Sequence, residues 1–150
     1  MNNLKNIKNI LFDCDGVLYS DLEAVFRQVS KRMTKYISNK LNLDLVKAKE
    51  LQRDYFHKYN TSLNGLMIHH DIPPEEFLEY VHDIDLSFME KDLVLRNELE
   101  NINLNKFVFT NGSRAHVKNI VKTLGIEDQF KDIFDIVDAK YHDILRPRYQ

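Results

Sequence analysis

The chain has 150 residues, enough for one ordinary domain or for a small core with an inserted lobe. Its net charge of −2, with both signs scattered along the chain, excludes a nucleic-acid polymer as partner and leaves small anionic ligands open. No apolar run approaches the ~18 residues of a membrane span, and the start lacks the apolar core of a signal peptide. We therefore expect a cytoplasmic protein with no membrane partner.

A short strand opens the chain, and helical periodicity follows it. Residues 7–12 are mostly apolar and partly β-branched, which predicts a buried parallel strand that ends at Asp13, where Gly16 lets the backbone turn. Apolar residues at helical spacing then predict two helices. Their apolar positions are Leu22, Val25, Phe26, Val29, Met33, Tyr36 and Ile37 in the first, and Leu45, Ala48, Leu51, Tyr55 and Tyr59 in the second.

The middle of the chain continues as helix. We expect a loop around Asn64 and Gly65, because this pair favours turns. Pro73 and Pro74, followed by two glutamates, predict a helix start, since proline suits the first turn and acids favour the positive end of the helix dipole. Its apolar face is Phe77, Tyr80, Val81 and Ile84, and a further helix is predicted over about residues 91–102.

Strands and helices alternate toward the end of the chain. A strand over residues 106–109 precedes a helix that Ser113 opens and Gly125 ends, and a third strand covers residues 133–137. The helix has its apolar face at Val117, Ile120, Val121 and Leu124. This order predicts an α/β fold in which helical crossovers join parallel strands. Ligands of such sheets bind beyond the carboxyl ends of the strands, where Asp13 and Thr110 both fall.

Two carboxylates follow the first predicted strand. Asp13 and Asp15 are two positions apart, so their side chains point the same way and repel one another unless a cation lies between them or one holds a proton. Mg²⁺ is the natural cation. A carboxylate can attack phosphorus to form an aspartyl-phosphate. We assign the nucleophile to Asp13, which ends the strand, and acid/base catalysis to Asp15.

A cradle for a phosphoryl group follows the second predicted strand. Thr110 offers a hydroxyl, and the backbone amides of Asn111 and Gly112 lie at the start of the helix that Ser113 opens. Either motif alone is a common turn sequence. Their joint occurrence, each directly after an apolar strand, indicates phosphoryl-transfer chemistry.

These motifs resemble those of the haloacid dehalogenase-like hydrolase superfamily. Its first motif is an apolar strand followed by Asp-x-Asp-Gly, as at residues 13–18, and its second is a strand that ends in Thr and often Asn-Gly, as at residues 107–112. Within that superfamily, four stretches look like the pyrimidine 5'-nucleotidase group. They are residues 13–19, residues 82–86, residues 110–113 with His116, and residues 124–136.

The resemblance implies an enzyme with two parts. Residues 1–19 and 93–150 would form a truncated Rossmann-like catalytic core, and residues 20–92 a helical cap that closes over the substrate. Mg²⁺ would be bound by Asp13 and the backbone carbonyl of Asp15. The substrate would be a small phosphorylated metabolite, a nucleoside monophosphate. The candidate substrate-facing residues in cap loops are Tyr59, Asn64, Gly65, His82 and Asp83.

The end of the chain departs from the superfamily pattern, which continues with a lysine, usually followed by proline, and then an acidic strand end. Arg146, followed by Pro147, falls near the expected lysine and is our candidate for a further phosphate contact, with Lys140 as the other. We expect a truncated chain whose first strand has an open edge, suited to self-association. The alternative to a magnesium-dependent phosphomonoesterase is a catalytically impaired protein that binds phosphate compounds or a partner without turnover.

The remaining cysteine and histidines suggest no further chemistry. Cys14 lies between two acids that should raise the pKa of its thiol, and no second cysteine can pair with it. His69 and His70 resemble a metal cluster, but neighbouring side chains diverge. The other histidines are interpreted as surface or capping residues: His57, His82, His116 and His142.

Overall fold

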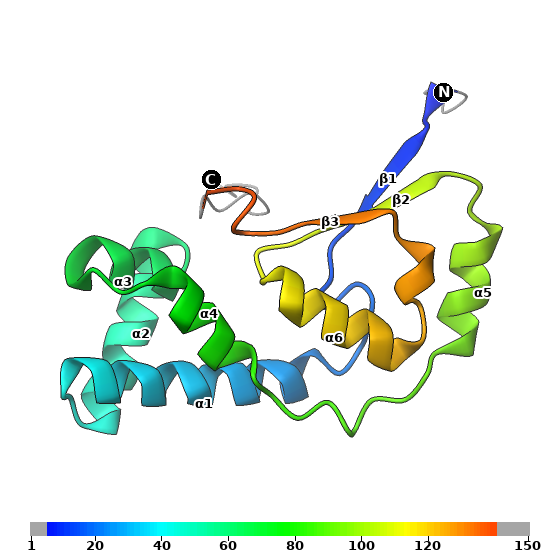
Figure 1. Ribbon diagram of the computed structural model, residues 1–150. Helices are drawn as coiled ribbons and strands as arrows, with labels where there is room; N and C mark the ends of the chain where they lie inside the picture. Colours follow the sequence, from blue (N-terminus) through cyan, green and yellow to red (C-terminus); the bar gives the residue numbers. More distant parts are fainter. Residues whose placement is uncertain (1–5, 141–150) are drawn as a thin grey trace. The chain divides into compact units, whose positions relative to one another are not determined.

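The computed structural model describes residues 6–140, which form two compact units (Figure 1). The first unit comprises the described residues within Met1–Leu22 and Leu86–Gln150, and the second is Glu23–Asp85. The functional division into a catalytic core and a cap remains a prediction. No helix in the described part of the chain is long and apolar enough to span a membrane.

The first unit is built on a parallel sheet. Its strands are β1 (Asn9–Phe12), β2 (Asn105–Phe109) and β3 (Asp132–Phe134), in the order β1-β2-β3. The helices of this unit are α5 (Leu93–Asn101), α6 (Arg114–Leu124) and the 3₁₀ turn η2 (Glu127–Gln129). Figure 1 shows β1, β2 and β3 side by side, and α6 contacts β3. The predicted α/β fold with parallel strands is confirmed.

The first strand is less buried than its sequence predicts. It begins at Asn9 rather than at residue 7, and its side chains alternate between exposed and half-buried, with Leu11 62% exposed. Among the described residues β1 pairs only with β2, so it is an edge strand. By contrast Val108 of the central strand β2 is fully buried. A short apolar run does not distinguish these two environments.

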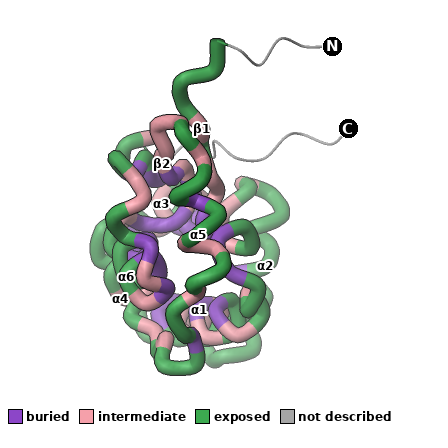
Figure 2. Tube along the Cα trace, turned by 90° about the vertical axis from the view of Figure 1, so that its right-hand side faces the viewer, coloured by how far each residue is buried: buried purple, intermediate pink, exposed green. Residues whose placement is uncertain are grey.

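Local capping signals fix the boundaries of α6. The Ser113 side chain accepts a hydrogen bond from the His116 N–H, and Gly125 ends the helix with a left-handed φ of 72°. The predicted apolar face is buried, and buried and exposed positions alternate along the helices in Figure 2. The third strand stops at Phe134, earlier than predicted, because the Asp135 carboxylate accepts N–H groups from the turn that follows.

The second unit is helical. Its elements are α1 (Leu22–Leu41), α2 (Leu45–Tyr59), α3 (Ser62–His70) and α4 (Pro74–His82). Proline at the start of α4 and acids in its first turn agree with the sequence, and the helix buries Phe77, Leu78 and Val81. Tyr36 of α1 meets Phe77 edge to face, with ring centroids 5.2 Å apart.

The loop predicted around Asn64 and Gly65 is wrong, because both residues lie in α3. Thr61 caps this helix by accepting the Asn64 N–H. A Cβ on Gly65 would lie 2.4 Å from Cγ of Tyr55, so the glycine allows α2 and α3 to pack closely. The Asn-Gly pair favours a turn locally, and this contact between helices outweighs that preference.

We expect Gly65→Ala to lower the free energy of unfolding by about 1–3 kcal/mol, because the added methyl group would overlap the Tyr55 ring. Chemical unfolding followed by circular dichroism measures this change. In an open helix the same substitution would stabilise the protein by up to ~1 kcal/mol, so a gain in stability would contradict the packing described. Ile68→Ala, at an exposed position of the same helix, is the control.

Candidate active site

The two predicted motif loops lie at the same edge of the sheet. Phe12 pairs with Val108 in parallel register, so the chain leaves β1 and β2 side by side. A Cβ placed on Gly112 would lie 3.8 Å from Oδ2 of Asp15 and 3.5 Å from Oγ1 of Thr110. The structure therefore brings together an acid of the first motif and the hydroxyl turn of the second.

The turn after β1 is held by its own backbone. The carbonyl of Cys14 accepts hydrogen bonds from the N–H groups of Val17 and Leu18, at 3.3 and 3.0 Å. Gly16 supplies the required left-handed φ of 78°. Cys14 is fully buried, and burial, with the charges of the flanking acids, raises the pKa of its thiol. The expected unreactive cysteine is consistent with this shift.

Asp13 lies at the boundary between sheet and turn. Its Oδ1 accepts the Cys14 N–H at 2.7 Å, which fixes the side chain directly beyond the strand. Burial raises the pKa of the Asp13 carboxyl, the Cys14 hydrogen bond opposes the shift, and the nearby Asp15 charge adds to it. The repulsion expected between the two carboxylates is therefore present.

Asp15 is held by two side chains that the sequence analysis did not place in the site. Tyr19 donates its hydroxyl to Oδ1 of Asp15 at 2.5 Å, and Nε2 of His116 lies 3.1 Å from the same oxygen. His116 is only 2% exposed, so its interpretation as a surface or capping residue is wrong. It lies one helical turn before Ile120, in the buried stripe of α6, and this spacing was the signal available in the sequence.

The turn after β2 is anchored to β3. Thr110, 1% exposed, donates its N–H to the carbonyl of Phe134 at 3.0 Å, and its Oγ1 accepts the Gly112 N–H at 3.0 Å. Gly112 in turn accepts the Ile136 N–H. Asn111, the remaining predicted member of this cradle, is half-buried. The Thr110 hydroxyl is thus fixed at the end of the central strand.

A buried acid, Asp135, supports this edge of the sheet and was not singled out from the sequence. Its carboxylate accepts the N–H of Arg114 at 2.6 Å, at the start of α6, and the N–H groups of Val137 and Asp138. Its place directly after β3 was the available signal. The three hydrogen bonds compensate for burial and fix the helix start beside Thr110.

The candidate substrate residues of the second unit form two groups. Tyr59 ends α2, and the Asn64 side chain donates to its carbonyl, while Gly65 packs under Tyr55. Tyr59 also bonds His69 through its hydroxyl. His82 ends α4, and Asp83, directly after it, pairs with Arg32 at 2.8 Å. Substrate contact by these residues remains a prediction.

The two candidates for the superfamily's phosphate-binding lysine, Arg146 and Lys140, lie near the end of the chain. Arg146 is outside the described residues. Lys140 is exposed at the end of the described part, where its N–H donates to the carbonyl of Val137 at 2.9 Å.

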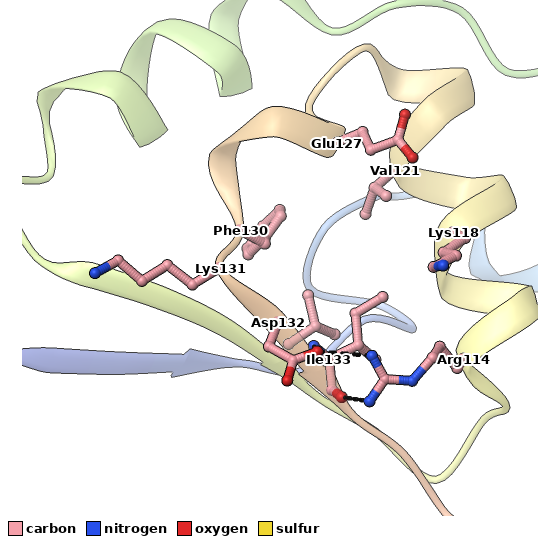
Figure 3. Close-up of a pocket in the computed structure, with 9 residues that line it drawn as sticks. Arg114, Lys118, Val121, Glu127, Phe130, Lys131, Asp132 and Ile133 are labelled. Atoms are coloured by element: carbon pink, nitrogen blue, oxygen red, sulfur yellow. Dashed lines mark hydrogen bonds and ion pairs between the residues drawn. The ribbon is translucent and has the colours of Figure 1, made fainter.

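A separate hollow of about 220 Å³ lies between α6 and the segment that leads into β3 (Figure 3). Its apolar wall includes Val121 and Phe130, and Arg114 at its rim pairs with Asp132 at 2.6 Å. None of the predicted site residues within the described part of the chain lines it.

In magnesium-free buffer we expect Asp13→Asn to raise the free energy of unfolding at neutral pH. Because folding raises the pKa of Asp13, the folded chain holds this proton more tightly than the unfolded chain. Ionised Asp13 therefore lowers the free energy of unfolding. This cost is absent below the unfolded-state pKa of Asp13 and grows as the pH rises through its folded-state pKa. Asparagine carries no charge and keeps an oxygen for the Cys14 N–H.

Urea unfolding at acidic and neutral pH measures this difference, which should be larger at neutral pH. Asp21→Asn, at an exposed position of the same unit, is the control. A gain for Asp13→Asn that does not change with pH would contradict the electrostatic origin.

Comparisons with known proteins show the family to which the chain belongs. The yeast (Saccharomyces cerevisiae) phosphate metabolism protein 8 is 30% identical over 138 residues, which are 84% of this chain and 42% of that protein. The chain thus spans less than half of that relative. A solved HAD-hydrolase, YfnB from Bacillus subtilis bound to magnesium, is 15% identical, with a TM-score of 0.45 over 91% of this chain and 66% of that one. Residues 7–148 match the model of the haloacid dehalogenase-like hydrolases, and the chain belongs to this family.

Proposed function

We propose that this protein hydrolyses phosphomonoesters through an aspartyl-phosphate on Asp13. The observation that carries the proposal is the close approach of Asp15 to the Thr110–Gly112 turn, where a Cβ on Gly112 would lie 3.8 Å from the Asp15 carboxylate. The acid/base group and the phosphate-binding groups must contact the same phosphoryl group of the substrate. The short distance between Asp15 and the Thr110–Gly112 turn allows this. Membership of a hydrolase family supports the same reaction class.

The first step forms the phosphoenzyme. The Asp13 carboxylate attacks phosphorus, a new O–P bond forms, and the ester P–O bond breaks. The departing alcohol oxygen takes a proton from the Asp15 carboxyl, which becomes a carboxylate. Oδ2 of Asp13 is the oxygen for the attack, because Oδ1 is engaged by the Cys14 N–H.

The second step restores the enzyme. A water molecule attacks phosphorus and gives a proton to the Asp15 carboxylate, while the bond between phosphorus and Asp13 breaks. Inorganic phosphate leaves, and both side chains return to their starting protonation states. In both steps the Thr110 hydroxyl, fixed at the end of β2, is the proposed donor to the phosphoryl oxygens.

The oxygen donors of this site fit Mg²⁺, which the family resemblance implies. Asp13 would supply a carboxylate oxygen and Asp15 its backbone carbonyl, and the Asp15 charge adds to the negative charge on this turn. Mg²⁺ is commonly held by one or two carboxylates together with water and substrate phosphate. Within residues 6–140 no cluster of three or more His, Cys, Asp or Glu side chains offers another metal site. When bound, the ion offsets the repulsion between an anionic nucleophile and an anionic ester.

The finer proposal is a pyrimidine 5'-nucleotidase that acts on nucleoside monophosphates. It rests on the likeness of four stretches to that group: residues 13–19, residues 82–86, residues 110–113 with His116, and residues 124–136. Tyr59, Asn64, Gly65, His82 and Asp83 are the proposed substrate contacts. The name of the yeast relative, phosphate metabolism protein 8, is compatible with a phosphate ester as substrate.

The proposal is tested by phosphate release from uridine and cytidine monophosphates and from 4-nitrophenyl phosphate, with Mg²⁺ and after its removal with a chelator. We expect Mg²⁺-dependent release that Asp13→Asn abolishes, because asparagine is not a nucleophile at phosphorus. Asp21→Asn is the matched control and should keep wild-type activity. A folded wild-type chain that releases phosphate from none of these esters would refute the proposal. Faster release from other esters than from pyrimidine nucleotides would refute only the finer assignment.

Replacing Thr110 tests the phosphate cradle. We expect Thr110→Val, which keeps the shape but loses the hydroxyl, to lower kcat/KM by roughly 10²–10³, as for other single preorganised donors. Thr110→Ser keeps the hydroxyl and should retain most of the activity. Equal losses in both variants, with unchanged circular dichroism, would show that the hydroxyl itself is not needed.

A further inference from the structure

Two buried donors converge on one oxygen of Asp15, an arrangement that the proposed reaction does not by itself require. Tyr19, 8% exposed, and His116, 2% exposed, both contact Oδ1, at 2.5 and 3.1 Å. The Asp15 side chain is 19% exposed. The donors come from separate parts of the fold, since Tyr19 ends the turn after β1 and His116 lies in the first turn of α6.

We propose that Tyr19 and His116 are positioning residues that hold Asp15 with Oδ2 directed at the Thr110–Gly112 turn. The inference rests on the proposed function, in which Asp15 exchanges a proton with the leaving oxygen and then with water. With Oδ1 bound by both donors, this exchange takes place at Oδ2.

The place of Gly112 supports this orientation. A Cβ there would lie 3.8 Å from Oδ2 of Asp15 and 3.2 Å from Cδ2 of His116. Oδ2 therefore lies on the side of the phosphate cradle, whereas Oδ1 lies on the side of the two donors. His116 and Asp15 both border the same small residue, so the histidine ring packs against the turn whose Thr110 hydroxyl would bind the phosphoryl group.

The chemistry of the donors suits this role. The Tyr19 phenol is buried and donates its hydroxyl proton to Oδ1 of Asp15. The backbone N–H of His116 donates to the Ser113 side chain, which fixes the first turn of α6 from which the ring extends. An acid held in one orientation loses no conformational freedom when the substrate binds.

The decisive experiment compares two substrates that differ in their need for an acid. Uridine monophosphate has a poor leaving group that must be protonated, and 4-nitrophenyl phosphate has a good one. The parameter kcat/KM covers the steps up to loss of the leaving group, so it reports the acid role of Asp15. We expect His116→Leu and Tyr19→Phe each to lower kcat/KM for uridine monophosphate about 10–100-fold, and for 4-nitrophenyl phosphate much less.

Two matched variants separate positioning from a structural role. His116→Gln keeps an N–H donor near the place of Nε2 and should restore most of the activity that His116→Leu loses. His57→Leu, at an exposed position of the second unit, should leave both substrates unaffected. Equal losses for the two substrates, with no rescue by glutamine, would overturn the inference.

A measurement without substrate keeps the inference testable if the proposed function fails. Three-bond NMR couplings give the χ1 rotamer of Asp15 in the chain alone. We expect one rotamer in the wild type and in His116→Gln, and averaging between rotamers in the Tyr19→Phe, His116→Leu double variant. One fixed rotamer in that double variant would overturn the positioning role, whatever the activity.

Discussion

The parallel pairing of β1 with β2 is the constraint on which the candidate site depends. The pair begins with Asn9 beside Asn105, residues 96 positions apart whose side chains share a 2.8 Å hydrogen bond. Since side chains alternate between the two faces of a strand, a shift of one residue would turn Asp13 away from its present side. The register therefore sets both the distance between the motif loops and the direction in which their side chains point. The entire second unit lies between these strands in sequence, and closing so long a connection is opposed by chain entropy.

Hydrogen bonds at this edge of the sheet offset the free-energy cost of removing polar groups from water on folding. Burial raises the pKa of the Asp13 carboxyl, and the nearby charge of Asp15 adds to this shift. Backbone and side-chain donors offset part of this penalty: the Cys14 N–H on Asp13, and Tyr19 and His116 on Asp15. The buried carboxylate of Asp135 accepts three N–H groups in the same way. Such donors both stabilise a strained charge arrangement and restrict its geometry, so the interactions that permit the site also orient it.

Local signals in the sequence predicted the features that depend on near neighbours. The boundaries of α6 follow from Ser113 and Gly125, and the helix start at Pro74 follows from proline and the glutamates after it. The features that the sequence did not predict depend on contacts between distant residues. His116 is buried because it meets Asp15, 101 positions earlier in the chain. The half-buried character of β1 follows from having one neighbour among the described strands, which no property of residues 9–12 reveals.

The two Asn-Gly pairs of the chain show why the neighbours of a glycine, and not its sequence context, indicate its role. Asn64–Gly65 lies inside α3, where a Cβ on the glycine would overlap the Tyr55 ring. Asn111–Gly112 lies in the turn after β2, where a Cβ would meet the Thr110 hydroxyl, His116 and the Asp15 carboxylate. At both positions neighbouring side chains lie close to the place that a Cβ would take. Helix packing explains why position 65 is a glycine. Gly112 instead brings polar groups from two strand ends together and leaves space beside groups that can bind and protonate a substrate.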